Sequence, residues 1–178
     1  MRIGIIVKRI SIYFLLILAA FLMQTCVFPI LGFLSATPNL ILIITFSYGY
    51  IYGTMTGMIC GFFAGLLMDL FYPEAFGLFI LFYSYLGFFS GLFSKQLKND
   101  SLIFPLILCT VNELVYNGAL LCYRFIAVGR MNIIYSIFKV IIPELFFTLI
   151  ITIIAYRILL NTNRKLDKID NIRGKNVA

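Results

Sequence analysis

The sequence predicts an all-α integral membrane protein with six transmembrane helices and with both termini in the cytoplasm. Hydrophobic residues make up 62% of the 178 residues and charged residues only 12%, whereas a soluble domain carries about 25% charged residues. The apolar residues form long unbroken runs, which is typical of spanning helices of roughly 20 residues and unlike the alternation of a membrane β-barrel. The composition therefore excludes an ordinary soluble protein.

Six apolar segments follow one another along the chain. The first ends at Phe28-Pro29, and the second begins at Pro38, because proline is favoured in the first turn of a helix. A single helix over 38–72 would be about 52 Å long at about 1.5 Å per residue, far beyond the ~30 Å hydrocarbon core, so we expect a break near 49–57. The predicted spans are about 10–30, 38–52, 55–72, 76–94, 102–123 and 133–160. Residues 1–160 then form the membrane domain, and residues 161–178 form a basic cytoplasmic tail.

The positions of the basic residues indicate an even number of spans. Most of the 14 Lys and Arg residues lie in three places: before the first span, after the fourth, and after the sixth. Because short basic loops stay in the cytoplasm, six spans place all three clusters on that side, and five would not. The net charge of +7 thus indicates topology and contact with lipid, and no nucleic-acid binding is expected.

Residues for catalysis or for metal binding are not evident. The chain has no His, and its four Cys residues lie in apolar segments without CxxC spacing, so we expect buried apolar thiols rather than a metal site or a disulfide. No phosphate-binding glycine loop is present either. We predict that the protein is not an enzyme and uses no cofactor. The basic, then apolar N-terminus is similar to a signal peptide but has no A-x-A cleavage site, so we expect an uncleaved first span.

Glycines recur every four residues along the third predicted span and lead to an acidic residue. Gly57, Gly61 and Gly65 share one helix face, and the next step along that face is Asp69. Small residues allow helices to pack closely, so we expect this face, with Asp69, to meet a partner helix rather than lipid. Two interpretations stay open: Asp69 and Glu74 only end a helix and fix a turn, or Asp69 marks a site or a partner contact.

Further polar residues are predicted to lie inside the bundle in the fifth and sixth spans. Asn112, Glu113 and Asn117 lie near the middle of the fifth span, and Leu120 and Arg124 continue the face of Glu113. An unpaired charge at this depth costs at least about 2.5–3.5 kcal/mol, so Glu113 should be protonated, paired or bonded to the Asn side chains.

The first half of the sixth span carries Lys139 and Glu144. Lys139 and Glu144, which follows Pro143, point in different directions, because five residues correspond to about 140° around a helix. We therefore expect Lys139 to pair with Glu113 or Asp69 across helices, or else to extend its ammonium group outward to the membrane surface.

The order of these features resembles that of a known family. Pro38-Asn39-Leu40 opens a span, the glycines follow, and residues 65–93 read GLLMDLFYPEAFGLFILFYSYLGFFSGLF. This resembles the MreD family of rod shape-determining proteins, in which a small-residue span ends in G-x-x-x-D and is followed by G-x-x-x-x-x-Y-x-x-x-G. The second motif corresponds here to Gly77, Tyr83 and Gly87, with Gly91 four residues later. The match is best over 38–94.

The resemblance implies a non-enzymatic, multi-pass protein of the bacterial inner membrane that takes part in cell elongation. Members of the family are thought to bind MreC and, with the MreB filament and the peptidoglycan polymerase and transpeptidase, to support lateral wall synthesis and cell shape. On this basis we expect a docking scaffold whose basic tail lies on membrane lipids or touches a cytoskeletal partner. The predicted helix-packing or partner interface consists of Gly57, Gly61, Gly65, Asp69, Gly87 and Gly91.

A second function remains open from the sequence. The size and six-span layout also resemble those of the substrate-binding subunits of energy-coupling-factor vitamin transporters. In such a protein Asp69, Glu74, Asn112 or Glu113 would contact a solute. Those subunits often carry a small-xxx-small motif in the first span, whereas Ala19-Ala20 stand here without a small residue at 23 or 24, which weighs against this alternative.

Overall fold

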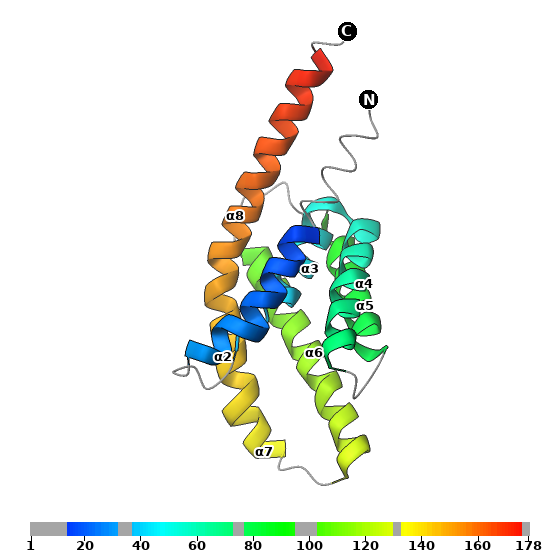
Figure 1. The fold of residues 1–178 in the computed structure, drawn as a ribbon, viewed down its shortest axis with the longest axis vertical. Coiled ribbons are helices and arrows are strands. Elements are labelled where there is room, and N and C mark those ends of the chain that lie inside the picture. Colours follow the sequence, from blue (N-terminus) through cyan, green and yellow to red (C-terminus); the bar gives the residue numbers. More distant parts are fainter. Residues whose placement is uncertain (1–13, 32–36, 73–76, 95–102, 130–132, 176–178) are drawn as a thin grey trace.

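The computed structural model describes residues 14–31, 37–72, 77–94, 103–129 and 133–175, and every regular element in these ranges is a helix (Figure 1). The predicted all-α class is therefore confirmed. Three helical stretches are long and apolar enough to cross a membrane, namely Thr54–Phe71, Ile103–Ile126 and Ile137–Ile158. Three shorter apolar helices accompany them, at Phe14–Ile30, Leu40–Tyr52 and Leu78–Leu92. The side of the membrane on which each terminus lies stays a prediction.

The first helix, Phe14–Ile30, is not regular along its whole length. It widens into a π-helical turn, η1 (Met23–Val27), and ends in α2 (Phe28–Leu31). Single π-helical turns inside α-helices often occur at functional positions, and this one contains Gln24, which reaches a neighbouring helix as described below.

A tight reversal separates the next two helices. Gly53 alone joins α3 (Leu40–Tyr52) to α4 (Thr54–Phe71), with a φ of +96° that glycine adopts far more readily than other residues. Gly49 and Gly57, four residues on either side, come so close that a Cβ on Gly57 would lie 2.5 Å from the Cα of Gly49. Residues 38–72 thus form two helices folded against each other, rather than one.

The helix after α4 completes a tightly packed group of three helices, α3, α4 and α5. α5 (Leu78–Leu92) starts after Gly77, which has a φ of +96°, and packs along α4 and beside α3. In Figure 1 the C-terminal end of α4 and the N-terminal end of α5 lie at the lower end of the group, opposite the junction of α3 and α4.

The remaining helices are longer and reach beyond this group at both ends. α6 (Ile103–Val128) runs from the upper end in Figure 1 to below α4 and α5. The chain then returns through α7 (Ile133–Ser136), the π-helical turn η4 (Ile137–Ile141) and α8 (Ile142–Lys175). The helix α8 continues beyond the predicted end of the sixth span near 160, through most of the predicted tail, to Lys175. No Pro or Gly occurs between Asn161 and Arg173 to stop it.

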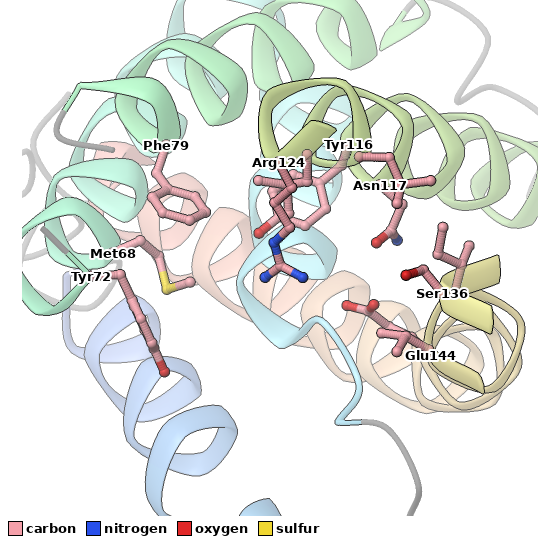
Figure 2. Close-up of a pocket in the computed structure, with 12 residues that line it drawn as sticks. Met68, Tyr72, Phe79, Tyr116, Asn117, Arg124, Ser136 and Glu144 are labelled. Carbon is pink, nitrogen blue, oxygen red and sulfur yellow. The ribbon is translucent and has the colours of Figure 1, made fainter. Parts of the chain in front are cut away.

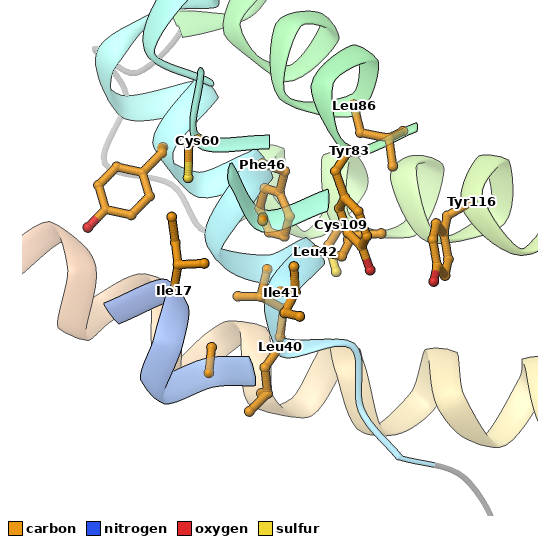
Figure 3. Packing of buried hydrophobic residues seen from close by; sticks show 14 of the residues in the cluster. Ile17, Leu40, Ile41, Leu42, Phe46, Cys60, Tyr83, Leu86, Cys109 and Tyr116 are labelled. Carbon is orange, nitrogen blue, oxygen red and sulfur yellow. The ribbon is translucent and has the colours of Figure 1, made fainter. Parts of the chain in front are cut away.

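The core is built around α3. This helix contacts α4, α5, α6, α8 and η1, and Leu42 and Phe46 are fully buried (Figure 3). At 13 residues, α3 is about 20 Å long at about 1.5 Å per residue, too short to span the ~30 Å hydrocarbon core. Other helices enclose it, so its length is not set by the bilayer. Large apolar side chains such as Ile59, Val115 and Ile154 are exposed on the outside, as lipid contact requires.

Candidate functional site

Five glycines form the contact between α4 and α5, which we call the glycine seam: Gly57, Gly61, Gly65, Gly87 and Gly91. A Cβ on Gly61 would overlap the carbonyl oxygen of Tyr83, and one on Gly65 would lie 2.5 Å from the Cα of Ile80. Packed carbon atoms prefer about 3.5–4.0 Å, so only glycine allows the two backbones to come this close. The face that the sequence predicts as a packing surface is therefore covered by a helix of the same chain.

Three helices meet at one point of the glycine seam. Cβ atoms added to Gly49 of α3 and to Gly57 of α4 would both overlap the carbonyl oxygen of Gly87 in α5. At the same level a Cβ on Gly91 would overlap the backbone of Thr54. The packing of α3, α4 and α5 thus depends on the absence of side chains at their common contact.

Asp69 caps the first turn of α5. Its side chain is completely buried. Oδ1 accepts a hydrogen bond from the N–H of Phe79 (3.2 Å), and Oδ2 accepts one from the N–H of Ile80 (3.0 Å). The first N–H groups of a helix have no partner within the helix, and an acidic group at this end also interacts favourably with the helix dipole. The helix that Asp69 meets is thus α5 of its own chain. Glu74, the other acidic residue of this stretch, lies outside the described residues.

A second cap, inside the bundle, starts α3. Asn39 is buried, and its Oδ1 accepts hydrogen bonds from the N–H of Leu42 and from the hydroxyl of Tyr83, each at 3.1 Å. The N–H of Asn39 donates to Thr148 Oγ1, and the N–H of Ile41 donates to Gln24 Oε1, again at 3.1 Å. Side chains from the first helix, α5 and α8 thus converge on the start of α3. These bonds satisfy backbone groups that have no access to water.

The predicted polar residues of α6, namely Asn112, Glu113 and Asn117, are all buried. Asn112 Nδ2 donates to Ser90 Oγ of α5 at 2.8 Å. Asn117 Nδ2 donates to Glu113 Oε1 at 3.5 Å. Both Asn112 and Glu113 are almost fully buried. The second carboxyl oxygen of Glu113, Oε2, has no hydrogen-bond partner among the described residues.

Lys139 does not lie in the bundle interior as predicted. Its side chain is exposed, and its ammonium nitrogen lies 5.6 Å from the centre of the Tyr135 ring, within the range of a cation–π contact. The π-helical turn η4 contains Lys139 and changes the angular register of the residues around it. A long basic side chain also has a lower free energy when its charged end reaches water instead of staying in an apolar interior. Glu144, in contrast, is half-buried and faces α6.

A pocket of about 220 Å³ opens between α4, α5 and α6 on one side and α7, η4 and the first turn of α8 on the other (Figure 2). Met68 and Phe79 form part of its apolar wall, and Asn117, Arg124 and Glu144 provide its polar groups. Figure 2 shows the ends of Arg124 and Glu144 directed into the same space. Asn117, Leu120 and Arg124 of the predicted α6 face thus line this pocket, whereas Glu113 does not.

The four cysteines form no disulfide in the described part of the chain. All four cysteines are free; Cys60 and Cys109 are buried, whereas Cys26 and Cys122 are exposed, contrary to the expectation that all are buried. In the described ranges no three His, Cys, Asp or Glu side chains gather where they could hold a metal ion.

A polar stripe on α8 was predicted only at Glu144, and its continuation was missed from the sequence. Glu144, Thr148, Thr152 and Tyr156 follow one another every four residues, and the last three are buried. Thr152 Oγ1 lies 3.1 Å from Cys109 Sγ of α6, and Thr148 contacts Asn39. The four-residue spacing of polar groups in an apolar segment was a usable signal for an inward face.

Asn39→Ala is expected to lower the apparent free energy of unfolding by about 2 kcal/mol, because it removes a helix cap and leaves buried donors without a partner. Tyr83→Phe removes one of the same hydrogen bonds and should cost about 1 kcal/mol. Since the two residues share a bond, the double variant should cost less than the sum. Thermal unfolding in detergent, followed by far-UV circular dichroism, measures all three. Strict additivity would contradict the coupling.

Comparisons with known proteins identify one match. The family model of the rod shape-determining protein MreD matches residues 5–165, which include all six helical segments and the pocket. No curated protein and no solved structure matches the chain significantly.

Proposed function

Because this chain belongs to the family of the rod shape-determining protein MreD, we propose that it is a non-enzymatic, multi-pass scaffold in the bacterial inner membrane. In this role it binds an MreC-like membrane protein and, through it, supports lateral peptidoglycan synthesis by a polymerase and transpeptidase alongside the MreB filament. The observation that carries the proposal is the family match over almost the whole membrane domain. The transporter-subunit alternative gains no support from this match.

The structure bears on where such a partner would dock. The glycine seam and Asp69 are covered by α5, so we place the contact elsewhere, on the lipid-facing surface. Ile59 of α4, Val115 of α6 and Ile154 of α8 are exposed there. A partner with a transmembrane helix would meet side chains of this kind first. The outer turn at 73–76, a further candidate, lies outside the described residues.

The tail has a separate proposed role. Residues 161–178 carry Arg164, Lys165, Lys168, Arg173 and Lys175, and each basic residue near an anionic leaflet contributes about 1 kcal/mol of attraction. In the proposal this segment lies on cytoplasmic lipid or touches a cytoskeletal partner. Removing residues 161–178 in the experiment below would separate that role from docking on the bundle.

Co-purification with photocrosslinking tests the scaffold proposal. A photoreactive phenylalanine analogue is placed singly at Ile59, Val115 and Ile154, with buried Leu42 as the matched control. We expect an MreC-like protein to co-purify from native membranes and to crosslink from at least one exposed position, with none from Leu42. Recovery of paired ATPases with a membrane coupling subunit, and no MreC-like protein, would instead establish a transporter subunit.

A further inference from the structure

The pocket between α4, α5, α6 and α8 combines opposite charges with apolar walls. Arg124 is the basic residue of its lining and Glu144 the acidic one. The two side chains, both among the described residues, form no direct ion pair with each other. Their charged ends face a common space (Figure 2). A ligand that bridges them needs an anionic group for Arg124 and a cationic group for Glu144.

The size of the pocket restricts that ligand. The pocket has a volume of about 220 Å³. It is smaller than the ~300–1,000 Å³ of ordinary small-molecule sites. A small head group therefore fits, and the rest of the molecule must lie outside. The apolar wall of Met68, Phe79 and Leu120 suits the hydrocarbon part next to such a head group.

The position of the pocket along the helices matches a membrane interface. It lies near the end of α4 and the start of α5, and Arg124 is one turn from the end of α6 at Val128. Tyr72 and Tyr135 are exposed at this end, and tyrosine is enriched where the hydrocarbon meets the head groups. This end is the predicted outer side of the membrane.

We propose that this pocket binds the head group of a zwitterionic phospholipid with a primary amine, of the phosphatidylethanolamine type. Arg124 donates to the phosphate, since its guanidinium group matches phosphate oxygens, and Glu144 accepts from the ammonium group. Asn117, which contacts Glu113 and Glu144, orients the Glu144 carboxyl group. The acyl chains lie along the outside of α4 and α6. The proposal does not depend on which partner protein docks on the bundle.

Native mass spectrometry of the detergent-purified protein tests it. Phosphatidylethanolamine and phosphatidylglycerol are added in turn, and the bound fraction is measured. We expect the wild-type protein to bind phosphatidylethanolamine about tenfold more tightly. Arg124→Gln should weaken binding of both lipids about tenfold. Glu144→Gln should leave phosphatidylglycerol binding intact and abolish the preference.

Controls separate this result from general charge effects. Lys139→Gln removes an exposed cation near the pocket that does not line it, and it should change nothing. Arg124→Lys keeps a cation and should bind more than Arg124→Gln. Equal binding of the two lipids by wild type, or an equal loss in Lys139→Gln and Arg124→Gln, would overturn the proposal. Competition by water-soluble phosphoethanolamine as strong as that by the lipid would also overturn it, because the acyl chains would then contribute nothing.

Discussion

Gly61→Leu is expected to abolish the folded three-helix group of α3, α4 and α5. Gly61 lies where a Cβ would already overlap the carbonyl oxygen of Tyr83, so a leucine side chain forces two backbones apart. Overpacking costs about 1–3 kcal/mol in a typical core and more in rigid ones. Here we expect about 3 kcal/mol or more, since the obstacle is main chain. The measurement is the yield of monodisperse protein in size-exclusion chromatography, with its melting temperature in detergent.

The matched control is Gly118→Leu. Gly118 also lies inside a long helix, α6, but a Cβ there would meet nothing within 4 Å. Replacing glycine in a helix interior removes a propensity penalty of about 1 kcal/mol, so this variant should be neutral or slightly more stable. Similar losses in both variants would show that the membrane helices tolerate no leucine at glycine positions, and close packing of the glycine seam would not be the reason.

Asp69→Ala is expected to have the second largest effect. It removes both acceptors of the Phe79 and Ile80 N–H groups, which then lie unpaired at the start of α5. Leaving a buried donor unsatisfied costs about 1–3 kcal/mol, so we expect a loss of about 2–4 kcal/mol in the apparent free energy of unfolding. Asp69→Asn keeps one oxygen acceptor and should lose about half as much.

The neighbouring residue supplies the control for Asp69. Leu70 is exposed, and Leu70→Ala should leave stability nearly unchanged. Amide hydrogen exchange gives a more specific readout, because only the Asp69 variants should speed exchange at Phe79 and Ile80. An Asp69→Ala protein that loses its partner protein while exchange at these amides stays slow would contradict the capping role and restore an external contact for Asp69.

The positions of the helices could be predicted from the sequence better than the contacts between them. Apolar runs and Gly53 located the segments closely, because hydropathy and helix-breaking residues are local properties. The helical continuation of α8 beyond the predicted span was not considered, because hydropathy indicates where an apolar span ends and not where the helix ends. The glycine spacing indicated the correct face of α4. It did not identify α5 as the neighbour, because spacing determines a direction on one helix and not what lies there.

The errors for individual side chains also arise because the sequence shows only local patterns. The prediction for Lys139 assumed a regular helix, and the π-helical turn η4 changes that geometry. Asn39 appeared only as part of a family resemblance. Its role depends on Thr148, 109 residues away, and on Tyr83, 44 residues away. Contacts over such separations leave no periodic pattern in the sequence.

The buried start of α3 has a consequence for how the protein is made. The N–H groups of Asn39 and Ile41 need Thr148 and Gln24 as acceptors. Gln24 is synthesised before α3, and Thr148 comes near the end of the chain. During membrane insertion the N–H of Asn39 at the start of α3 therefore has no acceptor until α8 has been inserted. A nascent chain that stops before residue 148 cannot complete this end. Completion of this buried helix start therefore requires α8, which supplies the acceptor for the N–H of Asn39.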